Sequence, residues 1–211
     1  MDMLEGEGGV RDYYLERLIM LSDGVFAIAM TLLALELRPP EHWDGTAVAL
    51  LNGMWRQLLA FGVSFLSIAF YWTGHRRSFK RFRRADGPLT AINLLLLGLV
   101  TLVPVGTRTV MEYGVRADGL FLYVGLIASI GVVNAALWGY AAFFGRLVDP
   151  DMPFRMRIVV FFILLLVPAT MSTLGIMAGN GGNWWVWLLM AGFWIGFASL
   201  RRWAGKGYEE K

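Results

Sequence analysis

Long apolar stretches separated by short polar connections dominate this sequence. Six stretches reach the length of about 20 mostly apolar residues that a helix needs to cross a bilayer. They cover roughly residues 15–37, 48–74, 89–111, 119–145, 157–178 and 184–203, and Pro, Gly, Asp and Asn mark the turns between them. The pattern predicts an all-α, six-transmembrane-helix integral membrane protein. We expect a leader at 1–13, a single transmembrane domain at 14–205 and a tail at 206–211.

Lys and Arg residues are concentrated on one side of this predicted domain. Of the 19 basic residues, only Arg38, Arg56, Arg108 and Arg116 fall on the other side. Cytoplasmic connections carry the excess of Lys and Arg in membrane proteins. With an even number of spans, both termini are therefore expected in the cytoplasm, which makes the leader and the tail cytosolic. No targeting signal is recognisable, and we expect a multi-pass protein of a bacterial plasma (inner) membrane.

The composition excludes several kinds of chemistry. The chain has no Cys and only two His residues, so disulfides, Cys-ligated metals and His-rich metal sites are excluded. It contains no phosphate-binding loop, dinucleotide fingerprint, H-E-x-x-H or G-x-S-x-G motif, so we expect neither an enzyme nor a cofactor. The basic, aromatic-rich run at 76–84 is explained by its position as a cytoplasmic connection, and no nucleic-acid partner is expected.

The first apolar stretch carries polar residues where a membrane helix normally has none. Arg17, Ser22 and Asp23 lie within or beside it, and a charge at membrane depth costs roughly 2.5–3.5 kcal/mol on insertion scales. Such residues therefore face the protein interior or water. Arg17 and Asp23 are six residues apart, about 120° around a helix, so each needs partners elsewhere. Candidate partners on the same side of the membrane are Trp72, His75 and Asn93.

The same helix presents a second pattern on one stripe. At helical spacing, Gly24, Ile28, Thr31 and Leu35 line up along it. One interpretation is ordinary helix packing, with the Thr31 hydroxyl bonded back to the carbonyl of Ala27. The other is a pore stripe, in which copies around a symmetry axis stack rings of apolar and hydroxyl groups. A single copy cannot enclose a pore, so the second interpretation requires a closed oligomer.

Three sequence segments resemble one known family. Arg17-x-x-x-Leu21-Ser22-Asp23, with the apolar run that follows, resembles the R-x-x-x-F-S-D signature helix of the transmembrane protein 175 family, which includes the endosomal and lysosomal potassium channel and bacterial relatives. The family's Phe is Leu21 here. Two further stretches are similar: Tyr71-Trp72-x-x-His75-Arg76, and Asn93 with the leucines that follow it.

The resemblance implies a homotetramer whose pore is lined by the first helix and has no T-V-G-Y-G filter. It implies that Ile28 forms an apolar gate, that Thr31 forms a hydroxyl ring near permeant potassium, and that Leu35 forms an outer constriction. It also implies an inter-helix network that positions the first helix. The residues that match this network are Arg17, Ser22, Asp23, Trp72, His75 and Asn93.

Three hypotheses for function follow. The first is a potassium-permeable cation channel that acts on monovalent cations in a lipid bilayer, with no bound cofactor besides the permeant ion. Outer acidic residues, Glu36, Glu41 and Asp44, either simply keep their loop solvated or raise the cation concentration near the mouth of the channel. The second is a secondary transporter, proton-coupled through Asp23 with His75 nearby. The third is a membrane scaffold that conducts nothing.

Overall fold

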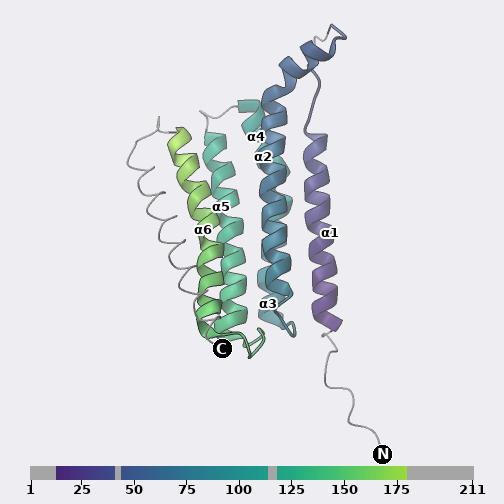
Figure 1. The fold of residues 1–211 in the computed structure, drawn as a ribbon. Helices are drawn as coiled ribbons and strands as arrows, with labels where there is room; N and C mark the ends of the chain where they lie inside the picture. Colours follow the sequence, from purple (N-terminus) through teal and green to yellow (C-terminus); the bar gives the residue numbers. More distant parts are fainter. Residues whose placement is uncertain (1–12, 41–43, 114–117, 180–211) are drawn as a thin grey trace, which may run out of the picture.

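The computed structural model describes residues 13–40, 44–113 and 118–179, and these are almost wholly helical. In Figure 1 the long helices lie side by side and alternate in direction. The elements are α1 (Tyr13–Leu35), α2 (Ala47–Phe79), α3 (Gly87–Thr101), α4 (Val103–Tyr113), α5 (Asp118–Gly139), a π-helical turn (Tyr140–Phe144) and α6 (Phe154–Gly179).

Four helical stretches among the described residues are long and apolar enough to cross a membrane. They are Tyr13–Leu35, Ala47–Phe79, Gly87–Tyr113 and Gly119–Phe144. These stretches correspond to the first four predicted spans. Helix α6 occupies the predicted fifth span, and the predicted sixth span at 184–203 lies outside the described residues.

Helix α2 is longer than the sequence pattern predicted. The apolar pattern ends near residue 74, but the helix continues to Phe79 through Arg76 and Arg77. Basic side chains in the last turn of a helix interact favourably with its dipole and remain in water, so the change in hydropathy does not end the helix. At 33 residues α2 is about 50 Å long, well beyond the hydrocarbon thickness of about 30 Å.

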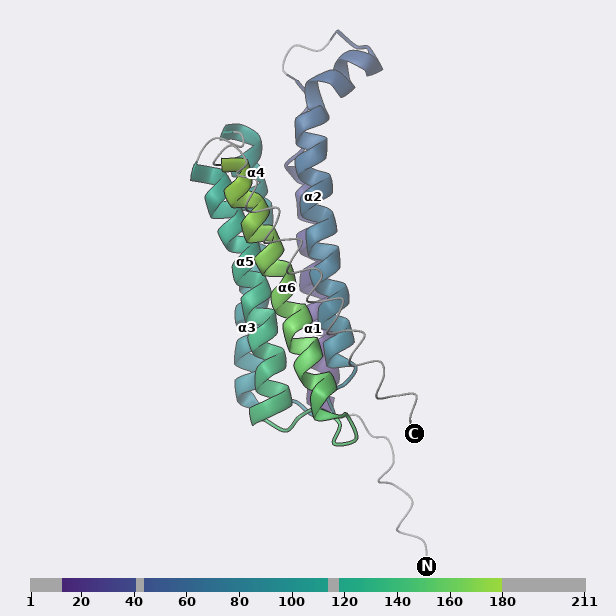
Figure 2. The same ribbon diagram turned by 60° about the vertical axis from the view of Figure 1, so that its left-hand side comes forward.

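The helices pack in two connected groups. Helix α1 contacts α2 and α3, while α5 contacts α3, α4 and α6. Figure 2 shows α3 beside α5 and α1 beside α2, in agreement with these contacts. One continuous core of buried apolar residues joins the groups, with Phe26, Leu96 and Trp138 among its members. The fold thus holds one face of α1 against its own subunit.

Two prolines lie inside the predicted third and fifth spans, and the structure treats them differently. The predicted third span is divided at Leu102 into α3 and α4, and Pro104 lies in the first turn of α4, where its missing N–H is tolerated. Helix α6 continues through Pro168. Gly131 of α5 faces that proline closely: a Cβ at residue 131 would lie 2.7 Å from the ring.

Asp86 fixes the start of α3 and its position against the π-helical turn. One carboxylate oxygen accepts a hydrogen bond from the backbone N–H of Leu89 at 2.9 Å, as an N-cap does. The other oxygen accepts from the hydroxyl of Tyr140 at 2.8 Å. A single side chain therefore caps one helix and ties it to the end of α5.

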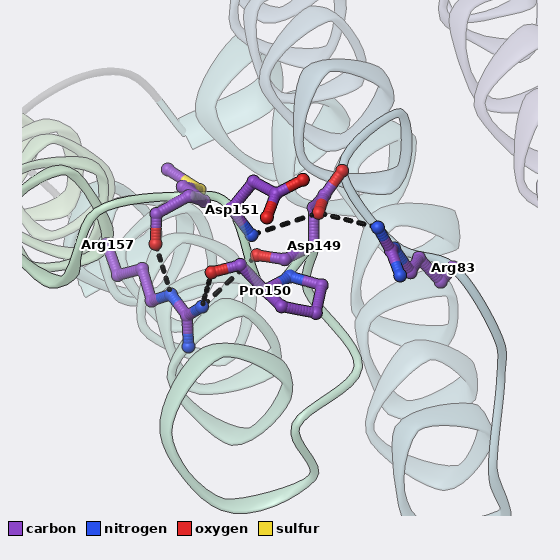
Figure 3. Close-up of polar contacts among 6 residues, drawn as sticks. Arg83, Asp149, Pro150, Asp151 and Arg157 are labelled. Atoms are coloured by element: carbon purple, nitrogen blue, oxygen red, sulfur yellow. Dashed lines mark hydrogen bonds and ion pairs between the residues drawn. The ribbon is translucent and has the colours of Figure 1, made fainter.

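The two basic connections, α2–α3 and α5–α6, meet at one end of the bundle. Phe82 and Val148 form an isolated antiparallel bridge, and Arg83 pairs with Asp149 at 2.8 Å. Figure 3 shows this pair beside Arg157, whose guanidinium donates to backbone carbonyls, including that of Asp149 at 3.1 Å. The connections that carry much of the positive charge therefore lie together, as the predicted topology requires.

Candidate functional site

Three buried polar side chains join α1, α2 and α3. Ser22 of α1, His75 of α2 and Asn93 of α3 are each at most 1% exposed. The Asn93 Nδ2 donates to Ser22 Oγ at 3.0 Å, and His75 Nε2 lies 2.8 Å from Asn93 Oδ1. Buried polar groups of this kind are costly unless they are bonded, so the three residues fix how the helices fit together.

The bond made by the Ser22 hydroxyl fixes which group donates in each hydrogen bond among Ser22, Asn93 and His75. The single hydroxyl proton of Ser22 is donated to the carbonyl of Leu18 at 2.8 Å. Ser22 Oγ can therefore only accept from Asn93, which places the amide nitrogen of Asn93 on that side. Its amide oxygen then faces His75, whose Nε2 must carry the proton and donate. The network thus assigns the Nε2–H form of His75.

Aromatic rings enclose the imidazole of His75. The ring of Phe79 stacks on it at a centroid distance of 4.1 Å, and the ring of Phe26 lies 5.5 Å away. Phe26 and Phe79 are themselves fully buried. Because these rings exclude water from the imidazole, a lost bond at Nε2 could not be replaced by a bond to solvent.

Asp23 forms a second contact between α1 and α2. The indole Nε1–H of Trp72 donates to its carboxylate at 2.7 Å. The guanidinium of Arg76 lies 4.9 Å above the Trp72 ring, a cation–π geometry. The indole therefore lies between an anion and a cation, and a charge-assisted bond holds α1 against α2 where Asp23 enters the apolar region.

Arg17 lies outside this network. Its guanidinium donates to the hydroxyl of Tyr13, at 2.9 Å, on the same helix and also lies over that ring. The angle between Arg17 and Asp23 explains the difference, because a residue about 120° away from the α2-facing side points elsewhere. Six residues match the family's network. The structure links Ser22, Asn93 and His75 by consecutive hydrogen bonds, and it joins Asp23 to Trp72 by a separate bond.

The opposite face of α1 is largely uncovered by the described residues of the subunit. Ile28 is 58% exposed and Leu35 is 74% exposed, and Thr31 between them is also exposed. The Thr31 hydroxyl donates to the carbonyl of Ile28 at 2.8 Å, not to that of Ala27 as the packing interpretation expected. The predicted stripe therefore points away from the residues that anchor the helix.

The outer acidic residues differ in their surroundings. Glu36 lies 3.8 Å from the guanidinium of Arg108. Asp44 accepts bonds from the backbone N–H and the hydroxyl of Thr46, at 2.9 and 2.8 Å, and these bonds lower the pKa of Asp44. Glu41 lies outside the described residues. At least two of the three carboxylates therefore have partners of their own.

One feature of the structured region was not found from the sequence. Ser64, Thr107 and Tyr123 form a cluster of hydroxyl groups between α2, α4 and α5. Isolated hydroxyl residues within apolar stretches were its only sequence signal, and such residues usually bond to their own helix. Within the described part of the chain, no group of three His, Cys, Asp or Glu side chains could hold a metal ion.

Comparison with known proteins places this geometry in a family. A family model described as "Endosomal/lysosomal potassium channel TMEM175" matches residues 17–104, which contain both polar contacts of α1. A protein of Chamaesiphon minutus named as a potassium channel is 39% identical over 137 residues, covering 62% of this chain and 68% of that relative. The chain belongs to the TMEM175 family.

Other TMEM175 relatives extend the match. A potassium channel of Streptomyces collinus is 35% identical over 140 residues, covering 64% of this chain and 68% of the relative. The human endosomal/lysosomal proton channel TMEM175 is 26% identical over 141 residues, which is 27% of its length. These relatives are channels, which confirms that this TMEM175 member is not an enzyme.

A solved structure shares the fold of this TMEM175 chain. The crystal structure of a lysosomal potassium-selective channel TMEM175 homolog from Chamaesiphon minutus superposes with a TM-score of 0.64 at 29% sequence identity. The superposition covers 89% of this chain and 96% of the other. The similarity therefore includes the helices that lie beyond the region matched by the family model.

Proposed function

We propose that this chain is one subunit of a homotetrameric, potassium-permeable cation channel in a bacterial plasma membrane. The pore is lined by the exposed face of α1. The division of that helix into two faces carries the proposal: Ser22 and Asp23 are bonded to neighbouring helices, while Ile28 and Leu35 have no such cover. When copies are arranged around a closed axis, the uncovered faces meet and enclose a path.

The chemistry of the exposed face suits a cation path. The Thr31 hydroxyl uses its proton on a backbone carbonyl, so its oxygen lone pairs are left to face a cation in place of hydration water. Ile28 forms an apolar ring that gates by dewetting, and Leu35 forms the outer constriction. The sequence contains no T-V-G-Y-G filter, so selectivity would arise at the α1 rings.

The topology proposed for this channel has six spans and cytoplasmic termini. One observation supports it: the α2–α3 and α5–α6 connections, which are rich in Arg, lie at the same end of the bundle. The channel function is supported separately by relatives from Chamaesiphon minutus and Streptomyces collinus, which align with about two thirds of this chain and are named as potassium channels.

A proton-coupled transporter has less support. Such a mechanism would use Asp23 together with His75, yet the structure holds these two residues in separate bonds. The names of the vertebrate relatives make proton permeation worth measuring in its own right. A saturable flux abolished by Asp23→Asn would favour a transporter, whereas a linear ohmic current favours a channel.

Potassium flux from proteoliposomes tests the proposal. We expect wild-type protein to pass potassium in preference to sodium, and Ile28→Asn to increase the flux because it wets the apolar ring. Leu66→Asn is the matched control, since Leu66 is 67% exposed on α2 and lies away from the proposed pore. If Ile28→Asn and Leu66→Asn change the flux equally, Ile28 does not form the gate. If assembled wild-type tetramers pass no potassium, the protein is not a channel.

A further inference from the structure

A groove of about 800 Å³ opens between the first half of α2 and the α4–α5 pair. In Figure 2 the upper part of α2 stands apart from α4 and α5. The residues that line the groove come from α2, α4 and α5. Its volume is within the range of about 300–1,000 Å³ seen for small-molecule sites. The apolar walls include Leu59, Val63, Val110, Met111 and Leu120.

The floor of the groove is made of hydroxyl groups that satisfy one another. Thr107 Oγ1 lies 2.8 Å from Ser64 Oγ and donates to the carbonyl of Val103 at 2.8 Å. Ser64 Oγ lies 2.9 Å from the hydroxyl of Tyr123. Because these groups already have partners, they do not demand a polar ligand, and an apolar chain can lie along the walls above them.

A cationic side chain lies at the rim. Arg56 lines the groove, is exposed, and holds its guanidinium 5.4 Å from the centre of the Trp55 ring. None of the ion pairs formed by the described residues involves Arg56. Arg56 precedes Ser64 by eight residues, which places it about 12 Å along the helix from the floor.

The length of α2 places this rim at the edge of the bilayer. The helix is about 20 Å longer than the hydrocarbon core, and its C-terminal turns carry the basic run. Counting about 20 residues back from His75 reaches Trp55 and Arg56. Trp and Arg are typical of the membrane interface, where a ring meets the head groups and a cation meets phosphates.

We propose that this groove binds an anionic phospholipid, with its phosphate paired to Arg56 and one acyl chain lying between α2, α4 and α5. The proposal follows from the arrangement of charge and shape. Arg56, which forms no ion pair with the described residues, lies at interface depth above an apolar groove. The groove runs inward and ends at hydroxyl groups that already have hydrogen-bond partners. A head group without net charge lacks the full attraction to Arg56, so the site prefers anionic lipids.

Native mass spectrometry of the purified full-length protein measures this directly. The protein is titrated with phosphatidylglycerol and, separately, with phosphatidylcholine that has the same acyl chains. We expect tighter binding of phosphatidylglycerol by about five-fold, the effect of one interfacial Arg on an anionic lipid. Arg56→Gln should remove this preference. Arg38→Gln, which removes an exposed Arg outside the groove, should leave it unchanged.

A second pair of variants tests whether an acyl chain lies in the groove. Ala60 lines the groove, so Ala60→Phe should weaken the binding of both lipids. Ala47→Phe adds the same bulk at an exposed position of α2 outside the groove and should not. The proposal is overturned if Arg56→Gln binds the two lipids as wild type does. It is also overturned if no lipid binds the assembled protein and Ala60→Phe changes its oligomeric mass, because a second copy then occupies the groove. Lipid binding needs no ion flux, so this result is independent of the proposed channel activity.

Discussion

Replacing Asn93 by Leu would remove the residue that joins three helices. Without the Asn93 amide, the Nε2–H of His75 keeps no acceptor and, with the imidazole 1% exposed, no water. Such a loss costs about 1–3 kcal/mol. Ser22 loses only an incoming donor, because its own proton stays on the Leu18 carbonyl. Hydrogen bonds between membrane helices average about 0.6 kcal/mol and reach about 1.7 kcal/mol.

Combining these figures, we expect Asn93→Leu to lower the free energy of unfolding by about 2 kcal/mol. Ser22→Ala should cost less, about 0.5–1 kcal/mol, since it removes one acceptor and leaves the His75 bond intact. The assay is equilibrium unfolding in mixed micelles. Adding His75→Leu to Asn93→Leu should cost less than the sum of the two single variants, because both partners of the bond are then gone.

The matched control is Asn134→Leu. Asn134 of α5 is 2% exposed, similar to Asn93, but its Oδ1 has no partner among the residues that the structure describes. Removing it should therefore be much less costly. If Asn93→Leu and Asn134→Leu agree within about 0.5 kcal/mol, the usual error of such comparisons, the reasoning about the three-helix chain is wrong.

Three further predictions concern other contacts. Trp72→Phe removes the bond to Asp23 but keeps a ring, and should lower the free energy of unfolding by about 1.5–3 kcal/mol, the range for bonds to charged groups; an unchanged unfolding midpoint would contradict it. Gly131→Ala should destabilise by about 1–3 kcal/mol, because the added Cβ would overlap the rigid ring of Pro168; a stability gain in thermal unfolding would show that α5 and α6 can separate freely. Arg83→Gln breaks an ion pair whose side chains are 59% and 47% exposed, and it should cost at most about 1 kcal/mol and less in high salt.

The sequence predicted the helical membrane class and the importance of the first helix for a clear physical reason. Polar residues inside an apolar stretch are costly, so Ser22 and Asp23 had to find partners. Trp72, His75 and Asn93 were expected as partners of Arg17 and Asp23 because of their side of the membrane. The structure bonds Trp72 to Asp23 and Asn93 to Ser22, and it bonds His75 to Asn93. Arg17 bonds to none of the three but to Tyr13 of its own helix. The order in which Ser22, Asn93 and His75 are hydrogen-bonded could not be predicted. Helical spacing fixes the angle of a residue on its own helix, but it does not show which residue of a neighbouring helix lies opposite.

Other features depend on contacts between distant segments. The hydropathy pattern predicted the third span as a single continuous helix, whereas the structure divides this span at Leu102 into α3 and α4. The bridge between Phe82 and Val148 joins two connections that are far apart in the sequence. The hydroxyl cluster around Ser64 combines residues from three helices. In each case the decisive partner lies on another element, which a pattern along one helix does not reveal.

The most direct test of the central claim asks whether the exposed face of α1 lines the conduction path. The chain has no Cys, so Thr31→Cys introduces a single thiol, and potassium flux can be measured before and after treatment with a charged methanethiosulfonate reagent. The account predicts that flux through Thr31→Cys is blocked, while wild type and Leu66→Cys are unaffected. If Thr31→Cys is fully modified and still conducts as before, the pore does not run along this face of α1.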